Sequence, residues 1–154
     1  MPDAIADVMA RFSAGLDSCD WALYRSVFAD EIDLDYSSWR PTSIGRWSAD
    51  AWVARAARLF PGLSASRHSI TNLLVLDHGN HATVRANVCA DHVIVDEDGT
   101  EVFTLNGVYH DRLVRSANGW VIAGKRLVVE WCVGDRRLLD RAADDVARGH
   151  LRRG

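Results

Sequence analysis

Residues 82–95, ATVRANVCADHVIV, alternate apolar and polar side chains over most of their length. Successive side chains of a β-strand point to opposite faces of a sheet, so this alternation predicts a long strand with one face turned toward a core. The inward face carries Val84, Ala86, Val88, Ala90, His92 and Ile94. The outward face carries Arg85, Asn87 and Asp91. The pattern therefore predicts a half-buried strand whose apolar face includes one histidine, His92.

Three more segments rich in Val, Ile, Leu and Thr surround this strand, at residues 67–77, 101–115 and 119–132. The sequences HGN, DEDG and SANG separate the four segments, and their composition is typical of hairpin turns. Consecutive hairpins predict an antiparallel meander of four long strands.

The chain before residue 61 predicts mainly helices. Apolar residues recur at helical spacing in residues 3–16, where Asp3 is a suitable N-cap, and again in residues 21–28. Residues 48–60 predict a third helix, which Ser48 caps and the following Pro-Gly pair ends.

Two shorter segments complete the pattern. Residues 32–36 alternate in the manner of a strand and place Tyr36 on the apolar face, whereas residues 40–47, RPTSIGRW, predict a loop. Residues 135–154 predict a C-terminal helix capped by Asp135 and followed by a basic, solvated tail, RGHLRRG.

Helices followed by a long meander favour an α+β fold, with N-terminal helices packed on a strongly curved, mostly antiparallel mixed sheet. A chain of 154 residues suits one domain, residues 1–154. No GxGxxG or P-loop motif occurs, so we expect no nucleotide cofactor.

Composition narrows the classes of partner. The net charge of −3 argues against nucleic acid, and no apolar run approaches the roughly 20 residues that a membrane span needs. The three cysteines lack metal-type spacing, and the N-terminus lacks the features of a signal peptide. We therefore expect a cytoplasmic protein with no metal, no cofactor and no membrane partner, which binds a small molecule.

Four polar residues are candidates for one interior: Asp17, Tyr36, His68 and His92. Asp17 has two interpretations. It could cap the second helix, since Asp20 follows at capping-box spacing, or it could orient a catalytic histidine. A pocket that holds a carboxylate, a phenol and two imidazoles has the groups that acid–base chemistry requires.

The chain resembles the SnoaL-like branch of the NTF2-like superfamily, and within it the scytalone dehydratases. The resemblance rests on the order of LDSCDW, VFADEIDLDY, RHSITN, a GxY at residues 107–109 and a GW at residues 119–120. It implies a cone-shaped α+β fold. It also implies that Asp17 pairs with His68, that His92 is the second histidine of the site, and that Tyr36 holds a water against the substrate carbonyl.

The same comparison leaves details open. Leu16 stands where those dehydratases have a tyrosine, and Tyr109 lies near the position of their substrate-binding asparagine. A bile-acid dehydratase of the superfamily uses an aspartate that Asp91 would match. The alternation of side chains along the strand places Asp91 on the outer face if His92 is on the inner face, so we favour His92 as the site residue. The substrate-binding candidates are Trp39, Asn72, Tyr109 and Trp131.

The function predicted from these features is a cofactor-independent lyase of the dehydratase type, acting on a small hydrophobic or polyketide-like carbonyl compound. His68 would abstract a proton and His92 would assist departure of hydroxide as water. An isomerase or polyketide cyclase could use the same pocket. A non-catalytic ligand-binding subunit, like the β subunits of ring-hydroxylating dioxygenases, is the alternative from another class. Exposed sheet surface predicts a homo-oligomer, a dimer or trimer.

Overall fold

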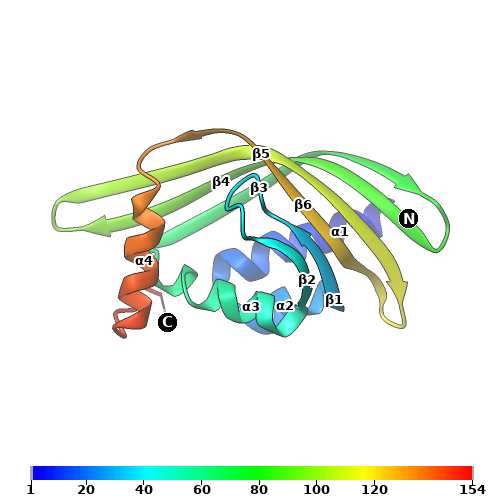
Figure 1. Ribbon diagram of the computed structural model, residues 1–154, viewed down its shortest axis with the longest axis horizontal. Helices are drawn as coiled ribbons and strands as arrows, with labels where there is room; N and C mark the ends of the chain where they lie inside the picture. The colour runs from blue at the N-terminus through cyan, green and yellow to red at the C-terminus, as the bar shows by residue number, and fades with distance from the viewer. Residues whose placement is uncertain (1, 154) are drawn as a thin grey trace.

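The computed structural model describes residues 2–153, and side chains from residue 4 onward. Figure 1 shows one curved sheet lying over a layer of helices. The elements are α1 (Pro2–Ser18), α2 (Trp21–Ser26), β1 (Phe28–Asp35), β2 (Ile44–Ser48), α3 (Ala49–Ala57), the 3-10 turn η1 (Phe60–Gly62), β3 (Ala65–Asp77), β4 (His81–Asp96), β5 (Gly99–Ser116), β6 (Gly119–Val133) and α4 (Arg137–Ala147). This order confirms the predicted α+β class.

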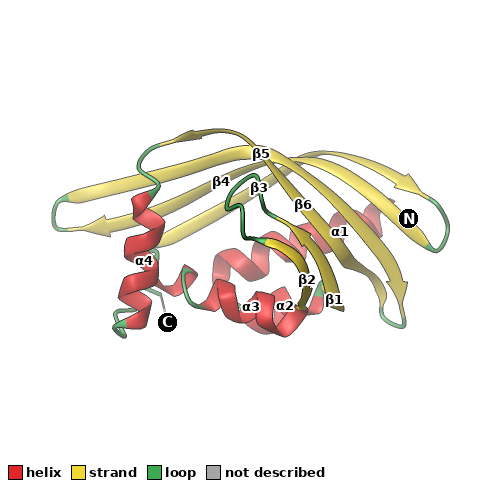
Figure 2. Ribbon diagram, viewed as in Figure 1, coloured by secondary structure: helices red, strands yellow, loops and turns green. Residues whose placement is uncertain are grey.

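The six strands form one mixed sheet in the order β2-β1-β6-β5-β4-β3. Strands β3 to β6 are the predicted antiparallel meander, whereas β1 pairs with β6 in parallel. The meander strands are 13 to 18 residues long. Their pairing shifts register once between β3 and β4 and twice between β5 and β6. Such bulges bend and twist a strand, so the long strands curve around the helices, which lie on the concave side (Figure 2).

Helix α1 supplies the main apolar surface beneath the sheet. Its buried side chains are Ile5, Val8, Met9, Phe12 and Leu16. The helix then packs closely on α2 because residue 15 is glycine: a Cβ there would lie 2.6 Å from the backbone nitrogen of Tyr24. This close approach brings the end of α1 to the centre of the molecule.

Three local predictions need correction. Asp20, and not Asp17, is the N-cap of α2, and its carboxylate accepts from the Leu23 N–H at 2.9 Å. The second helix ends at Ser26, because Phe28 already begins β1, which pairs with β6. The predicted loop at residues 40–47 contains most of strand β2, whose backbone pairs with β1 despite a sequence rich in turn residues.

The C-terminal tail is also not the solvated segment that its basic sequence suggested. The predicted helix is present as α4, but its N-cap is Arg136 and not Asp135, whose carboxylate accepts from the N–H of Arg137, the residue after the N-cap. Beyond α4, the backbone N–H groups of Arg152 and Arg153 both donate to the carbonyl of Pro61. The tail therefore packs on the η1 turn.

A buried ion pair lies inside the sheet's concave face. Lys125 on β6 donates to Asp111 on β5 at 2.8 Å, and both side chains are fully buried. The Lys125 ammonium also lies 3.5 Å from the ring centroid of Tyr109 and 4.2 Å from that of Phe12. Each charge is held inside the core only because its partner is there.

We predict that Asp111→Ala lowers the free energy of unfolding by about 3–5 kcal/mol, because it leaves a buried ammonium without its counter-charge. The double variant Asp111→Leu/Lys125→Met should lower the free energy of unfolding by clearly less, because it removes both charges. Urea denaturation measures both values. A double variant at least as damaging as the single one would show that the pair is not the source of the loss.

Candidate functional site

A cavity of about 330 Å³ lies between the helices and the concave face of the sheet. Its walls are mostly aromatic and aliphatic, and the polar residues that line it include Tyr36, His68, His92 and Tyr109. A volume of this size is at the lower end of the range for small-molecule sites. The cavity therefore combines an apolar enclosure with a small number of polar groups.

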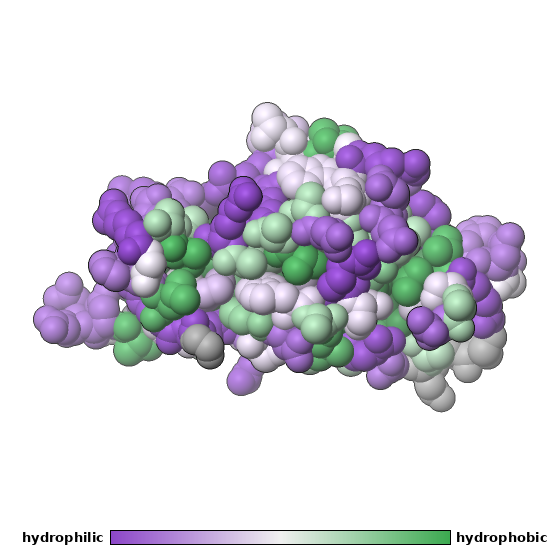
Figure 3. Space-filling view, turned by 90° about the horizontal axis from the view of Figure 1, so that it is seen from below, coloured by the Kyte–Doolittle hydropathy of each residue, from purple (hydrophilic) through white to green (hydrophobic). Residues whose placement is uncertain are grey.

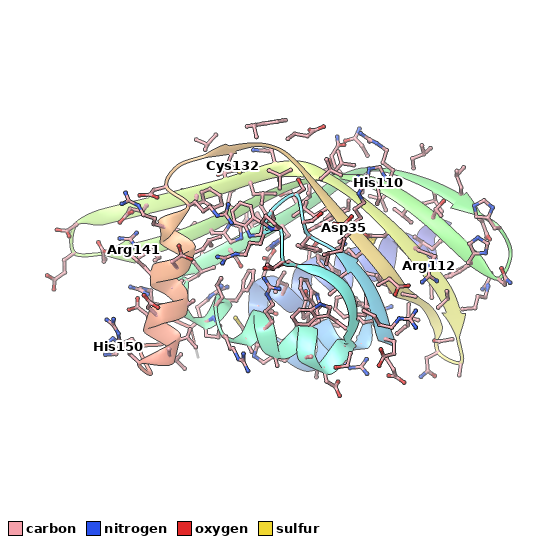
Figure 4. The ribbon with its side chains drawn as sticks, viewed as in Figure 1. Asp35, His110, Arg112, Cys132, Arg141 and His150 are labelled. Atoms are coloured by element: carbon pink, nitrogen blue, oxygen red, sulfur yellow. The ribbon has the colours of Figure 1, made fainter. Side chains whose placement is uncertain are left out.

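A second, shallower hollow of about 540 Å³ lies on the outer face of the sheet and is lined by side chains such as Asp35, His110 and Arg112. Figure 4 labels these three residues. Its carboxylates are paired there, Asp33 with Arg112 and Asp35 with Arg126. Because Asp33 and Asp35 are already engaged in these ion pairs, the inner cavity is the better candidate for a reactive site.

Asp17 contacts His68, which lines the cavity, but does not itself belong to the lining. Nδ1 of His68 lies 2.7 Å from Oδ1 of Asp17, within the range of a strong hydrogen bond. The backbone N–H of His68 donates to Oδ2 of the same carboxylate at 2.7 Å, and the Ser66 hydroxyl donates to Oδ1 at 3.0 Å. The last turn of α1 thereby holds strand β3 through one carboxylate.

The electrostatics of Asp17 favour its ionised form. Burial by itself would raise the pKa of this carboxyl, but the hydrogen bonds and charge of His68, with the Ser66 hydroxyl, hold the pKa below its ordinary value. An ionised carboxylate has only acceptors, so Nδ1 of a neutral His68 carries the proton. Nε2, on the opposite edge of the ring, is then the basic nitrogen of a side chain that lines the cavity.

His92 lies beside this pair, with its ring centroid 5.7 Å from that of His68. Nδ1 of His92 donates to the carbonyl of Phe103 at 3.2 Å. Burial, with the nearby charge of His68, lowers the pKa of His92 to about 4. His92 is therefore neutral at neutral pH, with Nε2 as an acceptor.

Two phenols form another part of the wall. Tyr36 follows β1 and Tyr109 lies on β5, and burial raises the pKa of both hydroxyls. Both groups are neutral and able to donate. Trp39 lines the same cavity, with its ring 5.7 Å from that of Phe103.

Two of the predicted substrate-binding residues lie elsewhere. Asn72 is exposed and has a φ of +54°, within the bulge between Thr71 and Leu74, so the alternation expected from His68 onward does not continue to it. Trp131, near the end of β6, is 57% exposed and does not line the cavity. Asp91 faces outward, as parity predicted, and accepts from the Thr104 hydroxyl at 2.6 Å.

Sequence reasoning missed Arg153, which supports the site from the C-terminal tail. Its guanidinium donates to the carbonyls of Phe60, Leu63 and Asp17 and to the hydroxyl of Ser66. Ser66 in turn donates to the Asp17 carboxylate. Arg153 and Asp17 are 136 positions apart in the sequence, so no local sequence pattern predicts their contact.

The model of the SnoaL-like domain family matches residues 2–126. The chain belongs to this SnoaL-like family. None of the curated proteins matches the chain significantly. Among solved structures, the Kfla4162 protein from Kribbella flavida is similar, with 26% identity and a TM-score of 0.82 over 92% of this chain and 97% of that one.

Two more similar structures have names that state an activity. One, from Novosphingobium aromaticivorans DSM 12444, carries the provisional name scytalone dehydratase; it has 20% identity and a TM-score of 0.73 over 87% of each chain. The other is the type-3 hexachlorocyclohexane dehydrochlorinase LinA from Novosphingobium barchaimii LL02, with 14% identity and a TM-score of 0.70 over 88% of this chain and 90% of that one. At these identities the likeness shows the NTF2-like fold.

Over the residues that the structure describes, no group of three or more His, Cys, Asp or Glu side chains is placed to hold a metal ion. Within the same residues, no helix is long and apolar enough to cross a membrane. The polar side chains that line this SnoaL-like cavity are two imidazoles, three phenols and three guanidinium groups, and the carboxylate of Asp17 contacts one of the imidazoles.

The lowered pKa of His92 predicts a specific loss of stability in acid. The unfolded chain binds a proton at this histidine near its ordinary pKa of 6.5, whereas the folded protein does so only near 4, so stability falls as the pH drops through this window. Between about pH 7 and about pH 4.5, the wild type should lose about 2–3 kcal/mol more unfolding free energy than His92→Gln. Urea denaturation at both pH values measures this difference. Equal losses would contradict a neutral, buried His92.

Proposed function

We propose that this SnoaL-like protein is a cofactor-independent lyase that eliminates water from a small carbonyl compound. The observation that carries the proposal is the contact between Asp17 and His68 at the wall of an enclosed cavity. A carboxylate that fixes one imidazole nitrogen and leaves the other free is the arrangement that general-base catalysis requires.

In the proposed first step, Nε2 of His68 takes a proton from the carbon next to the substrate carbonyl. Asp17 stabilises the imidazolium that forms, because its pKa is low enough for the carboxylate to stay ionised. The neutral hydroxyl of Tyr36, directly or through a water, donates a hydrogen bond to the carbonyl oxygen as the enolate charge develops.

In the second step, the enolate re-forms the carbonyl, the carbon–carbon double bond forms and the bond to the β-hydroxyl breaks. The leaving oxygen takes the proton that His68 holds, so water departs and His68 returns to its neutral form. Neutral His92 accepts a hydrogen bond from the substrate hydroxyl and orients it. Atoms and charges balance with the groups present.

The names of two structural relatives are consistent with this chemistry. A dehydratase removes water and a dehydrochlorinase removes hydrogen chloride, and both are eliminations that a base can start. An isomerase or polyketide cyclase would share the enolate and differ only in its fate, so product analysis separates these activities from a lyase. The alternative of a non-catalytic ligand-binding or dioxygenase β-like subunit gives no reason for a buried carboxylate–imidazole pair at a cavity.

We expect His68→Ala to lower kcat about 10²–10⁴-fold on a β-hydroxy ketone that the wild type dehydrates, because it removes a positioned base. Asp17→Asn should also cause a large loss, because an amide can favour the wrong tautomer of His68. Tyr36→Phe should lose less, mainly in kcat. Appearance of the conjugated ketone, followed by ultraviolet absorbance, measures these rates, and the exposed His110→Ala is the matched control.

The combined variant Asp17→Asn/His68→Ala gives the deciding comparison for the pair. If Asp17 acts through His68, the double variant should be little slower than His68→Ala alone. Losses that multiply would show that the two residues act independently and would contradict the proposed dyad.

We also propose that the protein forms a homo-oligomer, a dimer or trimer. Most of its large exposed apolar side chains lie on the strands, among them Leu74, Leu76 and Trp131. On the helix side, apolar residues are scattered among hydrophilic ones (Figure 3). Light scattering should give a mass of at least twice the 17.1 kDa of one chain, and a monomer at micromolar concentration would refute this proposal.

A further inference from the structure

The charged side chains that line the cavity are all of one sign. Arg40, Arg55 and Arg58 contribute to its wall, and within the described part of the chain no Asp or Glu does so. Arg40 and Arg58 are each at least partly open to solvent, and Arg40 is paired with Asp140 at 3.1 Å. The cavity thus presents positive charge next to an apolar enclosure.

Arg55 differs from Arg40, which has a carboxylate partner, and from Arg58, which is exposed. It lies in the last turn of α3, is half-buried, and donates to the neutral hydroxyl of Ser43 at 2.9 Å. Its guanidinium carbon lies 5.6 Å from the ring centroids of both Trp47 and Trp52. Across residues 4–153, no carboxylate lies within ion-pair distance of it, whereas Arg25 on the neighbouring helix has two.

The surroundings of Arg55 make this lack of a counter-charge costly. Burial, together with the positive charge of Arg40, lowers the pKa of the guanidinium, although an arginine remains charged at any physiological pH. A partly desolvated charge is stabilised most by an opposite charge that also accepts its hydrogen bonds. The planar guanidinium has five N–H groups, and the Ser43 hydroxyl accepts from only one nitrogen.

The two tryptophans hold the guanidinium in place for a ligand. Tyr36, the residue proposed to polarise the substrate carbonyl, packs on the same Trp52 ring at 5.0 Å between centroids. An anionic group on Arg55 would therefore lie on the Tyr36 side of the cavity. The aromatic and aliphatic remainder of the wall would enclose an apolar body.

We propose that the cavity binds an organic carboxylate, whose carboxylate group pairs with Arg55 and whose apolar or aromatic body fills the space next to His68 and His92. The site would then select carbonyl compounds that also carry a carboxylate. The binding of the anion stands on the arginine geometry alone, and its identity as part of the substrate rests on the proposed lyase function.

The test uses 2-naphthoate as the probe and 2-naphthamide as its neutral counterpart of nearly the same shape. Calorimetric titration of the wild type at neutral pH and low salt should show the carboxylate binding about 10- to 100-fold more tightly than the amide, the range expected for a charge-assisted hydrogen-bonded pair. Equal affinities, or no measurable binding of 2-naphthoate, would overturn the proposal.

Arg55→Gln should remove most of this preference by weakening 2-naphthoate binding, and should leave 2-naphthamide binding unchanged. Arg55→Lys should retain part of the preference, because it keeps the charge without the planar fork. Arg85→Gln, on the outer face of the sheet and outside the cavity lining, is the matched control and should keep the full preference. A full preference in Arg55→Gln would contradict the assignment, and circular dichroism verifies that each variant is folded.

The outcome is separable from that of the lyase proposal, because binding requires no proton transfer. Loss of turnover in His68→Ala without any carboxylate preference would refute the Arg55 site alone. A carboxylate preference that depends on Arg55, in a protein whose turnover does not depend on His68, would refute the lyase mechanism alone.

Discussion

The site depends on one half-buried carboxylate, that of Asp17. It belongs to the last turn of α1, yet it binds both the backbone and the side chain of His68 on β3, 51 residues later. These hydrogen bonds join the helix layer to the edge strand of the sheet. Because β3 is the last strand in the sheet order, this contact also fixes one wall of the cavity. The interaction that closes the fold is therefore the same one that orients the imidazole.

The support of this contact comes from both ends of the chain. The close packing of α1 on α2 at Gly15 fixes the position of the last turn, and Arg153 binds the Asp17 carbonyl and the Ser66 hydroxyl from the opposite terminus. Groups around a reactive side chain must be held rigidly if its nitrogen is to meet a substrate in the right geometry. Here the rigidity comes from hydrogen bonds that replace water at a half-buried carboxylate.

Much of this arrangement could be predicted from the sequence because it follows from periodicity. Strict alternation in residues 82–95 placed His92 inward and Asp91 outward, and both positions are confirmed. Alternation failed at Asn72, where a bulge with a positive φ changes the side-chain direction. Trp131, a substrate-binding candidate in the sequence, lies exposed near the end of β6. No sequence pattern indicated Arg55 or Arg153, since their roles arise from contacts between segments that are distant in the sequence. The same holds for β2, whose pairing with β1 overrides a turn-like composition.

We propose that Asp17 fixes the tautomer of His68 and leaves Nε2 as the base. Long-range proton–nitrogen NMR of protein labelled at its histidines, recorded at alkaline pH, measures the tautomer directly, and the spectrum of His68→Asn assigns the signals. We predict that neutral His68 carries its proton on Nδ1, and that Asp17→Asn shifts the population toward the other tautomer. A wild-type His68 protonated on Nε2 would contradict the account, because that nitrogen could then accept no proton from a substrate.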